Sequence, residues 1–237
     1  VYKRQGSDTT AVAIAAQIGA KRCDIYTDVD GVFTTDPKVV SNAKKLDSIT
    51  MEEMLELAGQ GAKVMQTRAV EFANKYKVPV RVLSSFNEGD GTLISLKGDG
   101  MENALISGIA FQNDQVKFTL HGVGDIPGTA LKILGPISEK DIEVDGIVQN
   151  VSVDGKTDFT FTVSKDDESD VKNIIEEIKK EVEFKDLMIN SDIAKVSLVG
   201  VGMRTHAGIA SKAFKALSEN DVNIQILSLI HISEPTR

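Results

Sequence analysis

The segment from Tyr26 to Lys38 gathers hydroxyl, carboxylate and cationic groups in one short stretch, Tyr-Thr-Asp-Val-Asp-Gly-Val-Phe-Thr-Thr-Asp-Pro-Lys. It continues the segment Cys23–Thr27, which predicts a short buried strand. Because ligands of open α/β sheets lie at the carboxyl ends of strands, Thr27 and Asp28 could hydrogen-bond a nucleotide there. Lys38 could meet a phosphate as a point charge. The alternative is a loop whose polar groups satisfy only one another, and the residue types alone favour neither interpretation.

Two other segments combine glycine with groups that could bind an anion. Gly61-Ala-Lys63 is predicted to open a helix, where free amide groups and the positive helix end favour a phosphate. Gly6-Ser7-Asp8 opens an earlier helix in the same way, and the Ser7 hydroxyl could donate to a substrate carboxylate. Taken alone, Lys63 is better explained as a solvated lysine and Ser7 as a helix cap.

The sequence offers little support for metal or nucleophile chemistry. His121, His206 and His231 are scattered, with no partner at the spacing of metal ligands, so we expect no metal held by histidine. Cys23 lies on the predicted strand and is expected to pack in the core. No catalytic residue can be assigned from these patterns.

Alternating helix and strand signals place the segments in an α/β domain. A helix is predicted over 11–18 with Ser7 or Asp8 as its N-cap, and a strand over 78–83. Thr50 and Glu53 have the spacing of a capping box. Apolar residues recur at helical spacing in Met65, Ala69, Phe72, Ala73 and Tyr76. We therefore expect a mostly parallel sheet with flanking helices over residues 1–98, with a boundary near 97–103.

The remainder of the chain contains an internal repeat. Residues 117–124 match 195–202, residues 128–132 match 208–212, and residues 138–142 match 218–222. Each copy reads as a strand, a glycine turn, a helix and a second strand, and the first copy continues through a strand at 159–163 and a helix at 170–182. We expect a ferredoxin-like βαββαβ domain over 106–190 and a truncated second copy over 193–237.

Composition narrows the classes of function. The 237 residues are 41% hydrophobic, enough to build cores for two domains, and no run of apolar residues is long enough to span a membrane. The net charge of -8 disfavours nucleic acid or an anionic membrane as a partner. The single cysteine suits a reducing compartment, so we expect a cytoplasmic protein.

Six segments, taken in order, resemble the aspartate kinases of the amino-acid kinase family, which carry tandem ACT domains. They are Gly-Ser-Asp-Thr-Thr-Ala at 6–11, Tyr-Thr-Asp-Val-Asp-Gly-Val-Phe-Thr-Thr-Asp-Pro at 26–37, Gly-Ala-Lys-Val at 61–64, Ser-Ser-Phe at 84–86, Gly-Val-Gly-Asp-Ile-Pro-Gly at 122–128 and Gln-Asn-Val-Ser at 149–152. Each segment is weak evidence alone, whereas their order and spacing over roughly residues 6–226 are specific.

The resemblance implies phosphoryl transfer from ATP, as its Mg²⁺ complex, to the side-chain carboxylate of L-aspartate, giving 4-phospho-L-aspartate. In the family's pattern Ser7 contacts the substrate aspartate. The residues that would contact the nucleotide are Thr27, Asp28, Phe33, Thr34, Thr35, Asp36, Pro37, Lys38 and Lys63.

The ACT resemblance implies an amino-acid effector, lysine alone or with threonine. It also implies a homo-oligomer paired through the ACT domains, or pairing with a separate regulatory subunit. The residues that would contact the effector are Asp125, Ile126, Ala130, Asp145, Gln149 and Asn150.

The departures from the family pattern define the alternatives. The family's N-terminal Lys-Phe-Gly-Gly-Thr segment, which supplies a catalytic lysine, is absent, so we expect an incomplete piece that is inactive alone. The alternative is a non-catalytic regulatory subunit that binds an amino acid. Lys38 stands where arginine is frequent, and Met65-Gln-Thr-Arg68 stands where the family often has Leu-His-Pro-Arg. Residues 1–5 and 227–237 are hypothesised to be sequencing-adapter read-through, since the resemblance stops abruptly at both points.

Overall fold

The computed structural model describes residues 6–96, 106–151, 155–200 and 208–228. The chain divides into two compact units, the first formed by Val1–Phe111 with Val196–Asn223 and the second by Gln112–Lys195 with Ile224–Arg237. The expected domain boundary near 97–103 lies outside the described residues. So do His206, His231 and the terminal segments 1–5 and 229–237. The domain limits given above remain predictions.

The first unit contains a four-stranded mixed sheet in the order β1-β3-β4-β2. Its strands are β1 (Cys23–Thr27), β2 (Ser48–Thr50), β3 (Val80–Ser84) and β4 (Thr92–Ser95). β1 pairs with β3 and β2 with β4 in parallel, whereas β3 and β4 are antiparallel. The expected α/β class is confirmed, and two of the three pairings are parallel.

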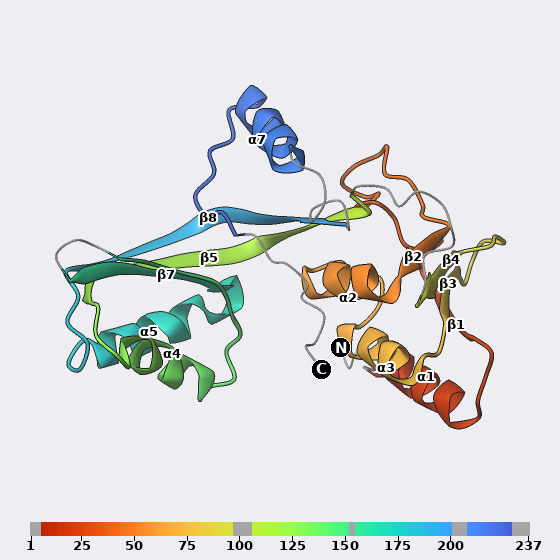
Figure 1. Ribbon diagram of the computed structural model, residues 1–237, viewed down its shortest axis with the longest axis horizontal. Helices are drawn as coiled ribbons and strands as arrows, with labels where there is room; N and C mark the ends of the chain where they lie inside the picture. Colours follow the sequence, from red (N-terminus) through yellow and green to blue (C-terminus); the bar gives the residue numbers. More distant parts are fainter. Residues whose placement is uncertain (1–5, 97–105, 152–154, 201–207, 229–237) are drawn as a thin grey trace. The chain divides into compact units, whose positions relative to one another are not determined.

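Helices α1 (Ser7–Gln17), α2 (Met51–Gly59) and α3 (Thr67–Tyr76) share one hydrophobic core with this sheet (Figure 1). β1 buries Cys23 and Ile25 and exposes Asp24 and Tyr26, which is the alternation of a strand covered on one face. The side chains of α3 that face the core are Ala69, Val70 and Ala73, each fully buried. Removing this apolar area from water is the main stabilising term of the unit.

Local signals in this unit are partly confirmed. The strand at 23–27 forms as predicted, and Thr50 and Glu53 make both hydrogen bonds of a capping box at the start of α2. The predicted cap of α1 is wrong: Gly6, with φ +93°, is the N-cap, and Ser7 and Asp8 already lie in the first turn. Glycine reaches this left-handed backbone conformation without the steric penalty of a Cβ atom.

The predicted apolar face of α3 is also partly wrong. Phe72 and Tyr76 are 36% and 50% exposed, while Val70 takes a fully buried place that the spacing did not assign. The two rings instead pair with each other on the surface, with centroids 5.6 Å apart. Aromatic side chains can therefore share the spacing of a core face and still lie outside it.

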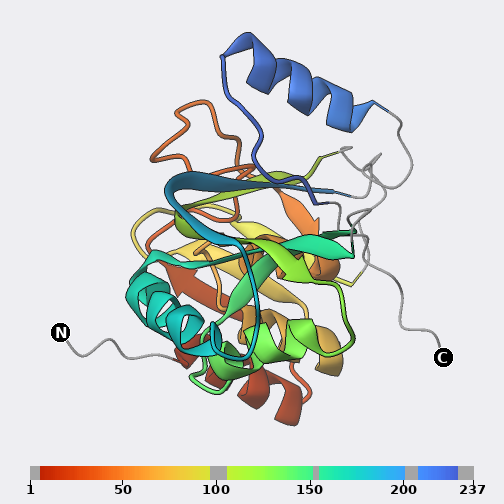
Figure 2. The same ribbon diagram turned by 90° about the vertical axis from the view of Figure 1, so that its left-hand side faces the viewer.

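The second unit has the predicted βαββαβ order. Its elements are β5 (Gly108–Gly124), α4 (Thr129–Ser138), β6 (Val144–Val151), β7 (Lys156–Ser164), the short 3₁₀ turn η1 (Lys165–Asp167), α5 (Glu168–Ile178) and β8 (Asp186–Val199). The sheet order is β6-β7-β5-β8, with antiparallel β5–β7 and β6–β7 pairs. Helices α4 and α5 lie on one face of this sheet (Figures 1 and 2). The ferredoxin-like fold is confirmed.

Strands β5 and β8 are long, and each contributes one end to the first unit. The strand ends that belong to the first unit are 108–111 and 196–199. Helix α7 (Ile209–Glu219) belongs to the same unit. Of these pieces, 196–199 and α7 lie in the second copy of the repeat, whereas 108–111 lies in the segment predicted as the first βαββαβ domain. Gly208 caps α7 with φ +104°, as Gly128 caps α4 with φ +92°, so the repeat in sequence is also a repeat in backbone geometry.

Candidate nucleotide and effector sites

The loops that follow β1 and β3 meet at one end of the first sheet. Thr27 ends β1, its carbonyl accepts a 2.7 Å hydrogen bond from the amide of Ser85, and its hydroxyl lies 3.1 Å from the carboxylate of Asp28. Asp28 is exposed. The structure therefore places Thr27 and Asp28, two of the residues predicted to contact the nucleotide, at the carboxyl end of β1, where a ligand can approach.

A second hydrogen bond fixes these two loops to each other. The amide group of Asn87 donates to the carboxylate of Asp30 at 2.9 Å. Hydrogen bonds from Asn87 and Ser84 lower the pKa of Asp30, so this carboxyl is ionised at neutral pH. The Ser84 hydroxyl also accepts from the amides of Phe86 and Asn87. The segment 84–87 thus has a structural role that the sequence motif alone did not assign.

The same loops line a hollow of about 390 Å³. Its walls are Tyr26, Arg81, Leu83, Ser84, Ser85, Phe86, Asn87, Glu88 and Gly89. Tyr26 and Phe86 are 65% and 79% exposed, so two aromatic rings stand free beside a cation. A planar base and an anionic group are the kinds of ligand that such a wall can hold.

The guanidinium group of Arg81 is held in place by Asp24. Arg81 and Arg22 donate to the Asp24 carboxylate at 2.7 and 2.6 Å. Burial raises the pKa of Asp24, but the hydrogen bonds and charges of the two arginines outweigh it and lower the pKa overall. Sequence reasoning missed this group, although the outward alternation of Asp24 and Tyr26 on the predicted strand was a usable signal.

The segment that contains Phe33–Lys38 forms an ordered hairpin rather than a loose loop. At its base the buried hydroxyl of Thr92 accepts from the Val32 amide at 2.9 Å and donates to the Leu46 carbonyl at 2.6 Å. A Cβ atom on Gly31, whose φ is +147°, would lie 2.5 Å from the Thr92 hydroxyl oxygen. Only glycine lets the chain pass this close to Thr92.

The arms of the hairpin are held by backbone bonds. Phe33 and Lys45 form an isolated antiparallel bridge. The amide of Thr34 donates to the Lys44 carbonyl at 2.8 Å, and the Thr34 hydroxyl accepts from the Lys44 amide at 3.1 Å. Thr34 is therefore engaged within the protein, which favours a positioning role over direct contact with a ligand.

The tip of the hairpin turns at Asp36, whose carboxylate accepts from the amide of Lys38 at 2.8 Å. Pro37 and Lys38 are exposed, Thr35 is half-buried, and Lys44 and Lys45 add exposed cations on the return arm. The sequence reasoning missed these two lysines, although they belong to the same loop. The exposed cations Lys38, Lys44 and Lys45 of this hairpin suit polyphosphate binding.

Lys63 does not open a helix, so that prediction is wrong. α2 ends at Gly59, Gly61 has φ +101°, and α3 begins only at Thr67. The chain needs the intervening residues to reverse direction, which leaves Lys63 exposed on a turn. Its charge can still reach an anion, but without the amides of a helix start.

Ser7 lies in the first turn of α1. Its hydroxyl donates to the Asp8 carboxylate at 3.3 Å, and the preceding Gly6 carbonyl accepts from the Thr10 hydroxyl at 2.9 Å. Ser7 is exposed, so its hydroxyl can change partner. Its contact with a substrate stays a prediction.

The second unit brings together part of the predicted effector set. The side-chain amide of Gln149 donates to the Asp125 carboxylate at 3.3 Å, and the Asp125 amide donates to the Gly155 carbonyl at 3.0 Å. Ile126 is 64% exposed and Ala130 is also exposed on α4. Polar groups of β6 and the start of α4 thus adjoin free apolar surface, a combination suited to an amino acid.

Asp145 and Asn150 are placed differently. Asp145 forms an ion pair with Lys195. Burial raises the pKa of Asp145, but hydrogen bonds from Lys195 and from the Gly146 amide, with the charge of Lys195, lower it overall. The backbone carbonyl of Asn150 accepts from the Thr157 hydroxyl, and the Asn150 side chain is exposed.

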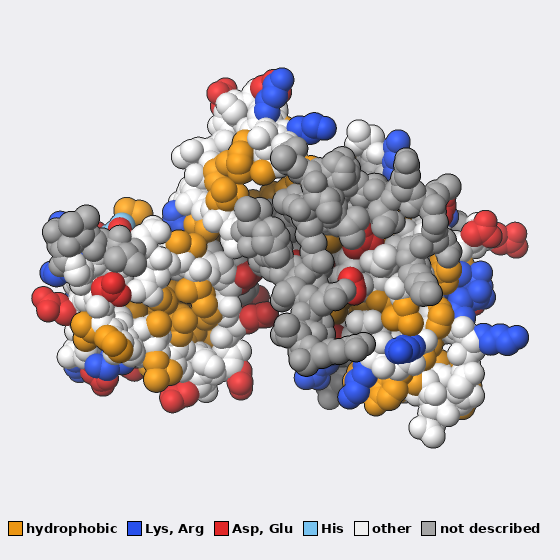
Figure 3. Space-filling view, in the orientation of Figure 1, with side chains coloured by type: hydrophobic (Ala, Val, Ile, Leu, Met, Phe, Trp, Pro, Cys, Tyr) orange, Lys and Arg blue, Asp and Glu red, His pale blue; other side chains and the backbone are white. Residues whose placement is uncertain are grey.

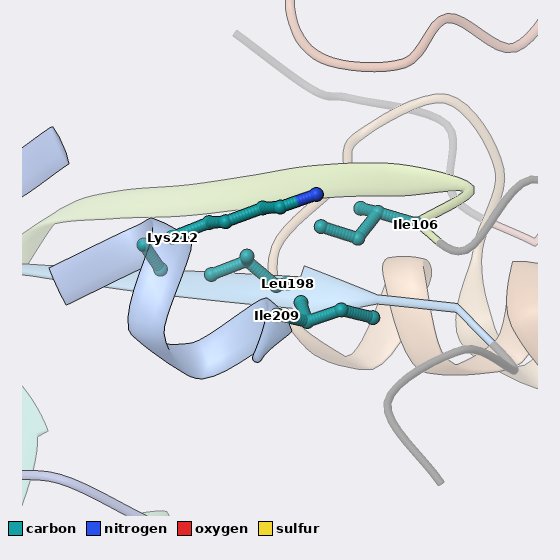
Figure 4. Close-up of a pocket in the computed structure, with 5 residues that line it drawn as sticks. Ile106, Leu198, Ile209 and Lys212 are labelled. Carbon is teal, nitrogen blue, oxygen red and sulfur yellow. The ribbon is translucent and has the colours of Figure 1, made fainter. Parts of the chain in front are cut away.

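An apolar pocket of about 370 Å³ lies in the first unit (Figure 4). Ile106, Leu198, Ile209, Lys212 and Ala213 line it. In Figure 4 the Lys212 side chain extends over Leu198 toward Ile106, with its amino group at the rim. Sequence reasoning found Lys212 only as a member of the repeat.

The described residues include no group of three or more His, Cys, Asp and Glu side chains arranged to hold a metal. His121 pairs instead with Asp158, at 3.0 Å. Cys23 is buried, as predicted. Its pKa is raised, mainly by this burial and to a smaller extent by the negative charges of Asp24 and Asp8. No helix in the described ranges has both the length and the apolar character of a membrane span.

Comparison with known proteins agrees with this architecture. The amino acid kinase family model matches residues 2–84, and two ACT domain models match residues 120–183 and 196–232. The aspartate kinase of Pseudomonas fluorescens is 57% identical over 97% of this chain and 56% of its own length. The chain therefore spans about half the length of the curated relatives that it matches.

Solved structures give the same result. The aspartate kinase of Clostridium acetobutylicum superposes with a TM-score of 0.83 at 28% identity, covering 97% of this chain and 53% of that one. Escherichia coli aspartokinase III superposes with a TM-score of 0.73 in complex with aspartate and ADP, at 29% identity over 91% of this chain and 48% of that one. Its complex with lysine and aspartate gives 0.72 at 28% identity, over 98% of this chain and 51% of that one. The order of segments, the two folds and these relatives together show that the chain belongs to the aspartate kinase family.

Proposed function

We propose that the protein to which this chain belongs transfers the terminal phosphoryl group of ATP to the side-chain carboxylate of L-aspartate, giving 4-phospho-L-aspartate. The observation that carries the proposal is the position of Thr27 and Asp28 at the carboxyl end of β1, followed in the chain by a hairpin with the exposed cations Lys38, Lys44 and Lys45. Membership of the aspartate kinase family, and the ADP and aspartate bound by the Escherichia coli relative, support this choice of substrates.

In this proposal the chain's residues position the nucleotide and neutralise its charge. Thr27 and Asp28 bind the nucleotide through hydrogen bonds, and Lys38 and Lys63 meet its phosphates as point charges. Residues 33–37 form the hairpin wall beside them. Mg²⁺ enters as part of the ATP complex, where phosphate oxygens supply the hard ligands that it prefers.

Ser7 contacts the substrate aspartate in this proposal, because its exposed hydroxyl can donate to a carboxylate. We assign the principal catalytic lysine to the part of the relatives that this chain does not cover. We accordingly propose that the chain alone does not turn over ATP, since positioning and charge neutralisation supply most of the rate in phosphoryl transfer.

The second unit is proposed to sense an amino acid, with lysine, alone or with threonine, as the effector. The lysine bound by the Escherichia coli relative supports this choice. The contact residues are Asp125, Ile126, Ala130, Asp145, Gln149 and Asn150. Hydrophobic side chains gather over the helices of this unit (Figure 3), and Leu131 is 74% exposed, which suits pairing of ACT units in a cytoplasmic oligomer.

The test is to express the full-length protein and to follow acyl phosphate formed from ATP and aspartate, with and without lysine and threonine. Activity that depends on both substrates and falls with one or both amino acids is the expected result. A protein that binds an amino acid but never turns over ATP would leave the regulatory-subunit alternative. Replacing Lys63 by alanine should raise the KM for ATP more than the KM for aspartate.

A further inference from the structure

Helix α2 is joined by side chains to two segments of the first unit, the start of β5 and the end of β8. The Ser107 hydroxyl, just before β5, donates to the buried Glu53 carboxylate of α2. The Ser107 amide donates to the Val199 carbonyl of β8 at 2.8 Å. At the other end of α2, the Ser197 hydroxyl lies 2.9 Å from the side-chain oxygen of Gln60. All these residues belong to the first unit.

The segment at the start of β5 also contacts the hairpin of residues 32–46, which is called the nucleotide hairpin below. The Ile109 amide donates to the Thr34 carbonyl at 2.7 Å. Between Ser107 and Ile109 the backbone is packed closely, because a Cβ atom on Gly108 would lie 2.9 Å from the Leu57 side chain and 3.4 Å from the Thr34 carbonyl oxygen. Residues 107–109 therefore link Glu53 and Leu57 of α2 to Thr34 of the hairpin. These contacts are called the seam below.

The Glu53 contact is costly to lose. Glu53 is 7% exposed, and its carboxylate accepts from the Thr50 amide at 3.2 Å, from the Thr50 hydroxyl at 2.8 Å and from Ser107. A buried carboxylate must be compensated by hydrogen bonds, so the Ser107 donor is part of what keeps this charge inside the protein. The capping box thereby also fixes the start of β5.

The Thr34 contact is the point where the hairpin meets the start of β5. The Thr34 amide and hydroxyl are bonded to Lys44, which leaves its carbonyl facing Ile109. Protein N–H···O hydrogen bonds have donor–acceptor distances of about 2.7–3.2 Å and weaken steeply when the angle at the hydrogen falls below about 120°. A displacement of residues 107–109 beyond this range must therefore either move Thr34 or break the bond.

We propose that Glu53, Ser107 and the backbone of Ile109 position the nucleotide hairpin and thereby set the affinity for ATP. The inference rests on the proposed function, because it gives the hairpin its ligand. It identifies positioning residues, none of which touches the substrate.

Two matched pairs of variants in the full-length protein test the seam. I109P removes the N–H that Thr34 accepts from, whereas I109A trims the side chain and keeps that N–H. S107A removes the donor to Glu53, whereas S197A removes a hydroxyl of β8 whose printed hydrogen-bond partner among the described residues is Gln60, at the end of α2. For each protein the kcat, the KM for ATP, the KM for aspartate and the melting temperature are measured.

The expected result is a KM for ATP about fivefold higher in S107A and I109P, the effect of one lost hydrogen bond. The KM for aspartate should stay within about twofold. I109A should show a smaller rise than I109P, and S197A should match the parent in the KM for ATP. S107A keeps the test valid if proline prevents folding, because it leaves the backbone unchanged.

An unchanged KM for ATP in an active, folded S107A protein would overturn the inference. An equal rise in S197A would do the same, because it would show a general effect of loosening α2. Absence of aspartate-dependent turnover in the unaltered protein would instead reject the proposed function. The two failures are therefore distinguishable in one set of assays.

Discussion

Replacing Gly91 by alanine tests the turn that leads from the hollow into β4. Gly91 has φ +66°, and a Cβ atom there would lie 2.1 Å from the backbone carbonyl oxygen of Val82 in β3. Gly89, two residues earlier, has no positive φ, and a Cβ atom there would meet nothing within 4 Å. G91A and G89A are therefore the same chemical change in two environments.

The magnitude follows from two terms. A left-handed conformation costs a residue with a Cβ atom about 1–2 kcal/mol. The overlap with Val82 cannot be relieved by a side-chain rotation, so β3 or the turn must shift, at a cost of about 1–3 kcal/mol. G91A should thus lower the free energy of unfolding by about 2–5 kcal/mol, a large share of the stability of a typical domain. G89A should change it by less than about 0.5 kcal/mol.

Urea unfolding of the full-length protein, followed by circular dichroism, measures both variants against the parent. Hydrogen exchange at the amides of β3 and β4 shows whether the loss is local to this sheet. A G91A protein within about 1 kcal/mol of the parent would refute the reasoning, since neither the backbone strain nor the overlap could then exist. An equal loss in G89A would show that the effect is not specific to Gly91.

Further variants test other parts of the two units. T92V keeps the side-chain volume but leaves the amide of Val32 and the carbonyl of Leu46 without a partner, so it should cost about 2–4 kcal/mol in urea unfolding; a loss below about 1 kcal/mol would contradict it. D24N should cost up to about 1 kcal/mol at pH 7, because this ion pair is partly exposed. The folded protein lowers the pKa of Asp24, so its contribution is present above about pH 4 and is lost as the pH falls through the lowered value; a gap between D24N and the parent that persists at pH 2 would argue against this. Q149A should raise the concentration of effector needed for half-inhibition several-fold without changing the KM for ATP, and an unchanged inhibition curve would remove Gln149 from the effector site.

The sequence by itself determined the features that depend on neighbouring residues. The strand Cys23–Thr27 follows from its residue types, and the capping box at Thr50 follows from residue types three positions apart. The repeat predicted the βαββαβ order, and the glycines at 128 and 208 open equivalent helices. The strand, the capping box and the glycine caps each depend on residues a few positions apart, so the local sequence is sufficient to predict them.

The tertiary structure alone decided which distant groups meet. Arg81 reaches Asp24, Asn87 reaches Asp30, and Ser107 reaches Glu53, each across more than fifty residues of chain. It also left Lys63 on a turn rather than at a helix start. No periodicity in the sequence encodes such pairs, because they arise only when strands and helices pack and bring one carboxylate within reach of one donor. For this reason the sequence predicted the residues that are proposed to bind the nucleotide. It predicted neither the hollow lined by Tyr26, Arg81 and residues 83–89 nor the contacts of residues 107–109.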